Sequence, residues 1–477
     1  MVMPRRQRRC YKCTKLPPFA SSVRLEGSAN EDCGDDWHCS LMGALCILQD
    51  SDDDKAKECA KMDQIYQQAY VTISAANAED CHHGFLGRAS SLYDDLPMLP
   101  IMCPDGRKGS VFVIPERRNL FQDPVQAHAW TLQEHVLSSR VLVWSKYNLF
   151  WQCTESFEPE HQETYALAGP YHLRQRLFRR DIFDRNCGDD QDESSLAILH
   201  QALSGRDPTG GGYYSFQFAP DFVHDEMQVL WERLMVEYSK RELSVKSDRP
   251  LALSGLVSRF REFVQDDYLA GHWRKWLLPH LLWRCVDGKG AVRLLESPPW
   301  SWLSVDGPIS VENLFSSEVK TFQPQPVATV ISCKTIPRFQ DAPYGQITSS
   351  ELIIRGYLGP VAVDAKTQTF DINYTYKAGE EQRFPKITID DPSVFWRVLE
   401  PTMSSLSTSP ALSNTVWCLP LFIFDAGRGS HDAVVRGIAL IKSSRIHYQR
   451  VGWFYGGANW CYRGPAQGLF EKDIVIV

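Results

Sequence analysis

The chain has 477 residues, of which 43% are hydrophobic and 23% charged, and its formal net charge at pH 7 is −7. This composition is that of a globular protein and excludes a wholly disordered chain. The negative balance offers no overall positive field to nucleic acid, and the length exceeds one hydrophobic core, which predicts about two to three domains.

The first 39 residues form a basic segment without a clear hydrophobic period. Its run "PRRQRRCYK" at residues 4–12 is a local exception to the acidic balance. A solvated, disordered tail is the simpler interpretation, and a nuclear address or an RNA-contacting arm is the alternative. No stretch resembles a signal peptide or reaches the roughly 18 apolar residues of a membrane helix. We therefore expect a cytoplasmic or, from the basic run, a nuclear protein without membrane contact.

The 14 cysteines are scattered along the chain. In a chain without an export signal, most of them are expected to be reduced and buried. Cys10 and Cys13 have the spacing of half a zinc site, but Cys33 and Cys39 lie too far apart to repeat it. We therefore expect no metal and no cofactor.

Residues 40–160 carry the pattern of an α/β domain. "SLMGALCILQD" (40–50) predicts a buried strand, a helix is expected through residues 55–69, and "YVTISAA" (70–76) predicts a second buried strand. Strand, helix and strand in a row predict a βαβ unit with a mostly parallel sheet. The apolar stripe of the helix is formed by Cys59, Met62, Ile65, Tyr66 and Ala69.

The rest of this domain predicts a strand at residues 109–115, a short helix in "WTLQEHVLSSR" (130–140) and a strand, turn and strand at 140–153. Trp130, Leu132, Val136 and Leu137 are candidates for the inner face of the helix. Acidic residues at Asp50 and Asp52–Asp54 either bind a cation or begin the earlier helix. The helix start is favoured, because one consecutive run cannot surround an ion.

Residues 161–300 predict a helical region, with helices at 225–243, 250–264 and 272–286. Residues 301–477 alternate as in a mostly antiparallel β-rich region. The apolar run 415–424 has the length of a buried strand. Trp300 and Trp302 stand two apart, as on one face of a strand, and are expected to pack between domains; a binding platform is the alternative.

Five of these segments, in this order, resemble the fungal heterokaryon-incompatibility (HET) domain family. They are "ALCILQDSDDDKAKECAKMDQIYQQAYVTISAANA", "HAWTLQEHVLSSRVLVW…LFWQC", "LWERLMVEYSKRELSVKSDRPLALSGLVSRF", "YLAGHWRKWLLPHLLWRC" and "SPPWSWLSVDGPIS". The residues that carry the resemblance, with an expected motif or structural role, are Leu45, Cys46, Ile47, Met62, Tyr66, Ala69, Trp130, Leu132, Gln133, Glu134, Arg140, Trp151, Trp300 and Trp302.

The chain also departs from the family's pattern. The first strand of the family, Tyr-x-x-Leu-Ser-Tyr-x-Trp-Gly, has no counterpart here, and Gly43 stands where the family has Asp. His128 and His135 replace two arginines around the Trp-Thr-Leu-Gln-Glu block. A truncated or degenerate, inactive copy would show such differences.

Gln133 and Glu134 allow two interpretations. The family has been likened to the Toll/interleukin-receptor fold, some members of which cleave NAD with a glutamate, so Glu134 or Glu58 is the candidate acid. The structural interpretation places Thr131 and Glu134 in a capping box, with Arg140 paired to Glu134 or to the chain end. We favour a structural or interaction role for this pair.

The function that the resemblance implies is fungal non-self recognition. A HET domain would trigger growth arrest or programmed cell death through protein partners, and self-association is possible. No nucleic acid is expected. An NAD-cleaving hydrolase, with NAD as its substrate, is the enzyme alternative.

Overall fold

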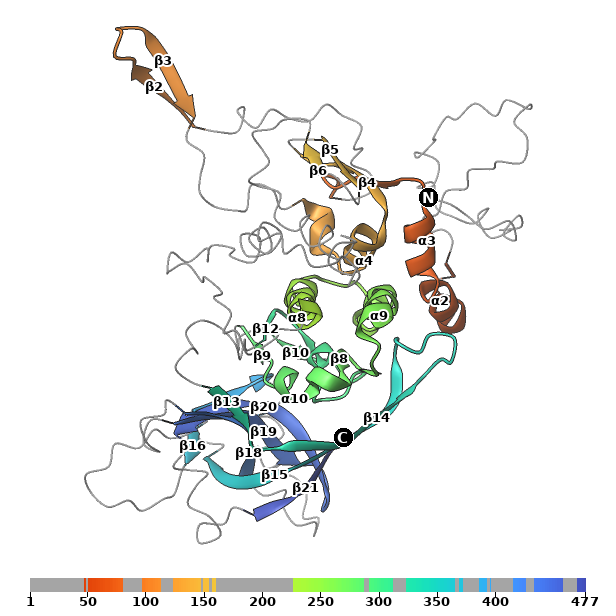
Figure 1. Ribbon diagram of the computed structural model, residues 1–477, viewed down its shortest axis with the longest axis vertical. Coiled ribbons are helices and arrows are strands. Elements are labelled where there is room, and N and C mark those ends of the chain that lie inside the picture. Colours follow the sequence, from red (N-terminus) through yellow and green to blue (C-terminus); the bar gives the residue numbers. More distant parts are fainter. Residues whose placement is uncertain are drawn as a thin grey trace, which may run out of the picture. The chain divides into compact units, whose positions relative to one another are not determined.

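The computed structural model describes residues 47–48, 50–79, 97–112, 123–146, 149–153, 157–159, 226–286, 291–311, 323–364, 369–371, 386–392, 395, 415–425, 433–457 and 470–477 (Figure 1). The chain divides into two compact units, Met1–Asp190 (unit 1) and Gln191–Val477 (unit 2). The predicted basic segment lies outside the described residues. The finer division at residues 39, 160 and 300 stays a prediction.

Two short helices open the described part of unit 1. They are α2 (Asp52–Cys59) and α3 (Met62–Gln68), where a single helix was predicted. The amide of Lys61 bonds to the carbonyl of Glu58, three residues back, so the turn tightens and the first helix ends. The predicted apolar stripe is buried at Cys59, Met62 and Ala69, whereas Ile65 and Tyr66 are half-buried.

The acidic run begins α2, as the favoured interpretation predicted. Ser51 is the N-cap, and its hydroxyl accepts a hydrogen bond from the amide of Asp54 at 3.3 Å. The Asp54 carboxylate in turn accepts from the amide of Leu48 at 2.9 Å. Two side chains three residues apart therefore satisfy backbone donors around the helix start, much as in a capping box.

The sheet of unit 1 is β1-β4-β5-β6, formed by β1 (Thr72–Ser74), β4 (Arg140–Trp144), β5 (Leu149–Cys153) and β6 (Phe157–Pro159). β1 pairs with β4 in parallel, but the β4–β5 and β5–β6 pairings are antiparallel. The prediction of a mostly parallel sheet is therefore wrong for the described strands. β4 and β5 are joined by a short connection, which allows only antiparallel neighbours.

The predicted βαβ unit is not confirmed. Of its first strand, residues 40–50, only Ile47, Leu48 and Asp50 are described, and none of them is in a strand; Leu45, Cys46 and Gly43 lie outside the described residues. The second strand exists as β1, but it is not buried, because Ile73 is about half exposed. The small core beside it is formed by Ala76, Val141, Val143 and Phe150.

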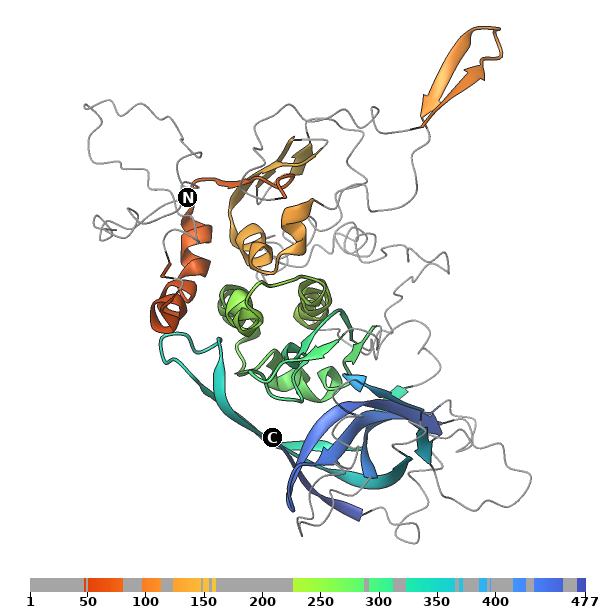
Figure 2. The ribbon, with the colours of Figure 1, turned by 180° about the vertical axis from the view of Figure 1, so that it is seen from behind.

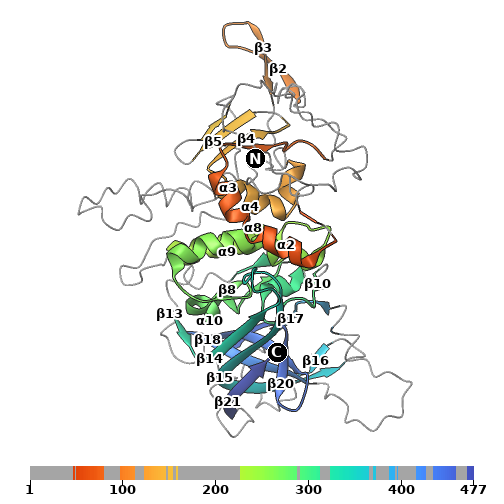
Figure 3. The same cartoon turned by 90° about the vertical axis from the view of Figure 1, so that its right-hand side faces the viewer.

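A separate two-stranded hairpin in unit 1 joins β2 (Met98–Met102) to β3 (Lys108–Phe112). The strands pair antiparallel, from Met98 opposite Phe112 to Met102 opposite Lys108. The strand predicted at residues 109–115 is confirmed up to residue 112, where the described range ends. Figure 3 shows the hairpin as a two-stranded ribbon, and no other strand of the described residues pairs with it.

The described part of unit 2 begins with two helices that lie side by side (Figures 1 and 3), α8 (Glu226–Ser239) and α9 (Leu251–Val264). Both were predicted, and the buried face of α8 includes Leu230, Leu234, Met235 and Tyr238. Trp231 of α8 meets Phe260 of α9 edge to face, with ring centroids 5.0 Å apart. The helical spacing of apolar residues in the sequence therefore predicts both helices correctly.

The helix predicted at residues 272–286 is wrong for most of its length. The segment from residue 268 instead forms β7 (Tyr268–Leu269), β8 (His272–Trp273), the 3₁₀ helix η9 (Arg274–Trp276), α10 (Leu277–His280) and β9 (Arg284–Cys285). Ala270 and Gly271 have φ values of 43° and 98°, so the chain turns back there. The indoles of Trp231 and Trp302 both donate to the Gly271 carbonyl, which holds this turn in the core.

The described residues of the β-rich region form a nine-stranded sheet. Its strands are β13 (Gln323–Pro326), β14 (Thr329–Pro337), β15 (Ile347–Asp364), β16 (Thr369–Asp371), β17 (Lys386–Ile389), β18 (Thr415–Asp425), β19 (Val434–Lys442), β20 (His447–Gly457) and β21 (Phe470–Ile476). Smaller elements of this unit are η8 (Lys246–Asp248), β10 (Val292–Arg293), η10 (Trp302–Ser304), β11 (Val305–Asp306) and β12 (Ile309–Ser310).

Five of these strands close on themselves, in the order β18-β19-β20-β21-β15 and back to β18 (Figure 2). The closing contact pairs Gly359 with Cys418 and Ala362 with Thr415. Every pairing described in the sheet is antiparallel except that of β20 with β21, which confirms the predicted antiparallel character. The predicted buried strand at 415–424 is β18.

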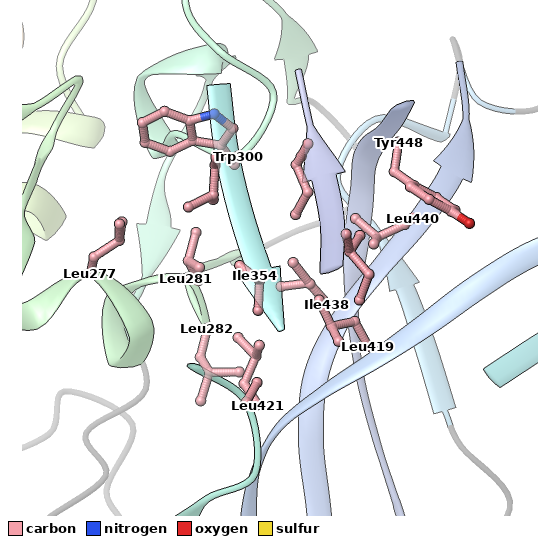
Figure 4. Packing of buried hydrophobic residues seen from close by; sticks show 14 of the residues in the cluster. Leu277, Leu281, Leu282, Trp300, Ile354, Leu419, Leu421, Ile438, Leu440 and Tyr448 are labelled. Atoms are coloured by element: carbon pink, nitrogen blue, oxygen red, sulfur yellow. The ribbon is translucent and has the colours of Figure 1, made fainter. Parts of the chain in front are cut away.

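The closed sheet and the helical segment share one hydrophobic core. Figure 4 shows Leu277, Leu281 and Trp300 facing residues of the closed strands such as Ile354 and Ile438. All these side chains are buried. The two regions that the sequence separates at residue 300 therefore pack in one compact unit.

A buried ion pair crosses this junction. Arg450 of β20 and Asp390, which follows β17, are only 0% and 2% exposed, and the Arg450 Nε lies 3.0 Å from the Asp390 carboxylate. Arg450 also donates to the carbonyls of Leu281 and Trp283 at 2.6 Å each, and its guanidinium lies 3.6 Å from the Trp283 ring centroid. Arg293 lies 3.7 Å from the same carboxylate.

Among the helices that the structure describes, none combines the length and the apolar character that crossing a lipid bilayer requires.

Candidate functional site

The Gln133–Glu134 pair lies on α4 (Trp130–Leu137), the short helix that the sequence predicts. Leu132, Val136 and Leu137 are buried, as expected for its inner face. Trp130, the fourth candidate for this face, is only half-buried. The helix lies between β1 and β4 in sequence, and its polar residues meet α3.

The predicted capping box at Thr131 and Glu134 is wrong. α4 begins at Trp130 with Ala129 as its N-cap, so Thr131 is already inside the first turn. Its hydroxyl donates back to the carbonyls of Val125 and His128 at 2.6 and 2.7 Å. Val125 belongs to the 3₁₀ helix η6 (Pro124–Ala127), so Thr131 links the two consecutive helices.

Gln133 is fully buried, which is rare for an amide side chain. Its Nε2 donates to the sulfur of Met62 on α3 at 3.1 Å. The sequence reasoning singled out both residues without placing them together. Because 71 residues separate them, no local pattern could have predicted this contact.

Glu134 lies beside Gln133 and also meets α3. Desolvation of its carboxyl group raises the pKa of Glu134 from its ordinary value of 4.5 to about 7, and a hydrogen bond from the side chain of Tyr66 opposes this rise. The residue as a whole is half-buried. A carboxyl group with this pKa can give or take a proton near neutral pH. Here it is held against a tyrosine of the neighbouring helix.

The end of α4 is tied to α3 and β1 by serines that the sequence reasoning missed. The Ser138 hydroxyl lies 2.6 Å from that of Thr72 on β1 and donates to the carbonyl of Glu134 at 2.5 Å. The Ser139 hydroxyl donates to the carbonyl of Gln67 on α3 at 2.6 Å. Consecutive serines at a helix end are the signal that could have indicated such bonds.

Arg140 does not pair with Glu134, so that prediction is wrong. Its guanidinium donates to the carbonyl of Tyr70 at 3.3 Å and lies 5.4 Å from the centroid of the Tyr70 ring. Arg140 is exposed at the start of β4, whereas Glu134 faces α3. The arginine therefore bonds to the segment that leads into β1.

Glu58, the other candidate acid, does not join this group. Its carboxylate pairs with Lys61 at 2.7 Å within the same turn, and Asp53 pairs with Lys57 at 2.7 Å. Such partly exposed pairs contribute little to stability. Within the described part of the chain, no three His, Cys, Asp or Glu side chains gather as a metal site would require.

The remaining predicted motif residues of unit 1 are spread out. Ala69 is buried behind α3, Ile47 is half-buried before α2, and Trp151 on β5 is 36% exposed. Trp151 pairs across the sheet with Leu142 and Glu158.

Trp300 and Trp302 belong to the core of unit 2. Both are completely buried, which rules out the binding platform. They are not in a strand, because Trp302 begins η10. The Trp302 indole donates to the Gly271 carbonyl at 2.8 Å, and the Trp300 carbonyl accepts from the Trp283 indole at 3.0 Å. Trp300 packs with side chains of both the helical segment and the closed sheet, within unit 2. The expectation that the two tryptophans pack between domains stays a prediction, like the division at residue 300.

A shallow polar groove in unit 2 contains none of the predicted site residues. It is lined by Ser258, Arg261, Glu262, Gln265, Asp266, Asp267 and Tyr344. The Arg261 guanidinium donates to the Tyr344 hydroxyl at 2.9 Å, so the cation is already engaged.

Glu134→Gln should stabilise the α3–α4 contact above neutral pH. Because the folded-state pKa of about 7 exceeds the ordinary 4.5, the native state binds the extra proton between these values. Wild-type stability is then highest below pH 4.5 and falls as pH rises to 7, by at most about 1.4 kcal/mol per pH unit. The variant carries no titrating carboxyl and should lose this slope. Hydrogen-exchange protection of α3 and α4, corrected for intrinsic rates, measures it; an unchanged slope contradicts the prediction.

Comparison with known proteins gives one match. Residues 42–134, or 93 of the 477 residues, match the family model described as Heterokaryon incompatibility protein (HET). Neither curated proteins nor solved structures gave a match. The matched segment contains α2, α3, β1 and Glu134 at its end, and it confirms the resemblance there. This domain indicates a role related to heterokaryon incompatibility; the resemblance claimed for later segments stays a prediction.

Proposed function

We propose that the protein signals growth arrest or programmed cell death in fungal non-self recognition, through contacts with protein partners in the cytoplasm. The observation that supports this proposal is the set of contacts made by the side chains of Gln133 and Glu134. Gln133 is buried against Met62, and Glu134 meets Tyr66, so both side chains join α4 to α3. Because both side chains are engaged in contacts with α3, they support a structural role within a signalling domain more than a catalytic role.

The surface of unit 1 adds support for an interaction role. The β2–β3 hairpin leaves Leu99, Ile101 and Val111 exposed by 51%, 40% and 42%. Contiguous exposed apolar side chains are typical of interaction sites.

The enzyme alternative is an NAD-cleaving hydrolase, for which NAD would be the substrate. The pKa of about 7 at Glu134 favours it, because a general acid or base works best with a pKa near the operating pH. A third reading is a degenerate, inactive copy. It rests on the sequence alone, on Gly43 and on the family's first-strand motif, which has no counterpart in the given sequence.

Induced expression in a fungal host tests these readings. Wild type, Glu134→Gln and the matched control Glu58→Gln are compared for growth and for cellular NAD. Glu134→Gln keeps the shape of the side chain but replaces the carboxyl group with an amide, which cannot give or take a proton near neutral pH. The signalling proposal predicts growth arrest by all three proteins at unchanged NAD.

The other outcomes distinguish the alternatives. Loss of NAD with wild type and Glu58→Gln, but not with folded Glu134→Gln, would establish the hydrolase and refute the proposal. If the wild-type protein is folded and abundant but does not affect growth, the signalling proposal is refuted and the hypothesis of an inactive copy is supported.

A further inference from the structure

Within its two strands, the β2–β3 hairpin has one sheet face without a charged side chain. Leu99 stands opposite Val111 and Ile101 opposite Gly109, so these four residues share a face. The large side chains among them are exposed. A lone two-stranded hairpin is only marginally stable in water, and further strands that extend its apolar face would stabilise it.

The two outer edges of this hairpin differ in their backbone donors. The amide of Cys103 bonds to the carbonyl of Arg107, which identifies a hydrogen-bonded pair at the turn. Bonded and non-bonded pairs alternate along an antiparallel ladder, so the backbone groups of Pro100 and Ser110, opposite each other, point outward. Proline has no amide hydrogen, and the β2 edge therefore lacks its central donor. The β3 edge keeps all of its donors.

We propose that two copies of this chain associate through the edge of β3 that no strand of the described residues covers, as an antiparallel pair with a two-fold axis at Ser110. This inference rests on the proposed function, because it names the partner surface of the interaction domain and assigns it to a second copy.

The sequence of β3 is compatible with this self-pairing. An axis at Ser110 places the backbone of Lys108 opposite residue 112 of the partner copy, so outward groups meet outward groups throughout. Val111 then lies opposite the partner's Gly109, where no side chain competes for space. Lys108 is the single charged residue of the strand, and the axis keeps the two lysines from facing each other. The result is a four-stranded sheet with one continuous apolar face.

Ser110→Pro tests the edge directly in the full-length protein. It removes the central outward amide, while the bonds between β2 and β3 use other residues. The matched control Ser110→Ala keeps the amide. Analytical ultracentrifugation over a concentration series should show a monomer–dimer equilibrium for wild type and for Ser110→Ala. For Ser110→Pro, the dimer dissociation constant should rise by at least about tenfold.

A second variant keeps the test valid if Ser110→Pro fails to fold. On the axis, the two Cα atoms at position 110 should lie about 5.5 Å apart, within the range of a disulfide. Ser110→Cys should then give a disulfide between copies, mapped by mass spectrometry, and Asp105→Cys at the turn should not.

A monomeric wild type at every concentration would overturn the inference, as would dimers unaffected by Ser110→Pro. Growth arrest by a monomeric protein would leave the proposed function standing while this inference fails. A dimer that forms through β3 but does not arrest growth would support this inference and contradict the proposed function.

Discussion

Replacing Arg450 by methionine should destabilise unit 2 by about 3–5 kcal/mol, because it breaks a buried ion pair and leaves its partner charged. Asp390 would keep only Arg293, at 3.7 Å. The carbonyls of Leu281 and Trp283 would lose their charged donor. Urea unfolding followed by tryptophan fluorescence measures the change, since Trp283 lies against the guanidinium.

A second ion pair of the same sheet provides the control. Arg355 and Asp473 pair through two bonds, at 2.8 and 3.1 Å, but both side chains are about half exposed. Arg355→Met should therefore leave the unfolding midpoint almost unchanged. If both substitutions lower the free energy of unfolding equally, the burial of Arg450 is not the reason for the effect of Arg450→Met.

Gly437→Ala should destabilise the closed sheet by about 3 kcal/mol or more, because the added methyl group has no room. A Cβ there would lie 2.1 Å from the carbonyl oxygen of Leu419 and 2.8 Å from the ring of Phe454. The first of these atoms is backbone in the neighbouring strand β18, which cannot move without breaking the β18–β19 pairing.

Gly356→Ala on β15 is the graded comparison for this prediction. Its Cβ would meet the end of the Leu419 side chain at 3.0 Å and the Ala328 side chain at 3.2 Å. A side-chain end can rotate away, so this substitution should cost clearly less than Gly437→Ala. Thermal unfolding of both variants measures the difference, and an equal loss would contradict the steric argument.

The elements that the sequence predicts well are those with a strong period of their own. α8 and α9 carry apolar residues at helical spacing along their length, and β18 is a continuous apolar run. Burial of such faces needs no particular partner, so a local pattern is enough. The helix predicted over 272–286 failed because its apolar content fits any buried conformation. Its course is determined by the turn at Ala270 and Gly271 and by the two indoles that donate to the Gly271 carbonyl.

The candidate site shows the same limit. The sequence identifies Gln133 and Glu134 as a pair worth attention, but not what they touch. Met62 and Tyr66 reach them from about 70 residues earlier, and only the fold makes them neighbours. Arg450 shows this limit more clearly, because the sequence of an alternating strand predicts that an arginine faces solvent. Its burial follows from Asp390 and two carbonyls of distant segments.

The closure of the sheet through β15 has a consequence for how unit 2 folds. β18, β19 and β20 follow one another along the chain and can pair as they emerge from the ribosome. β15 can pair early with β14, but the stretch of its edge that pairs with β21 must wait until β21 is made. Their contact at Arg355 and Asp473 spans 118 residues. At ordinary translation rates this wait lasts on the order of five to twenty seconds. During it, the apolar β15 presents an unpaired edge to other nascent chains. The yield of folded protein in a cell therefore depends on chaperone capacity as well as on the stability of the finished fold.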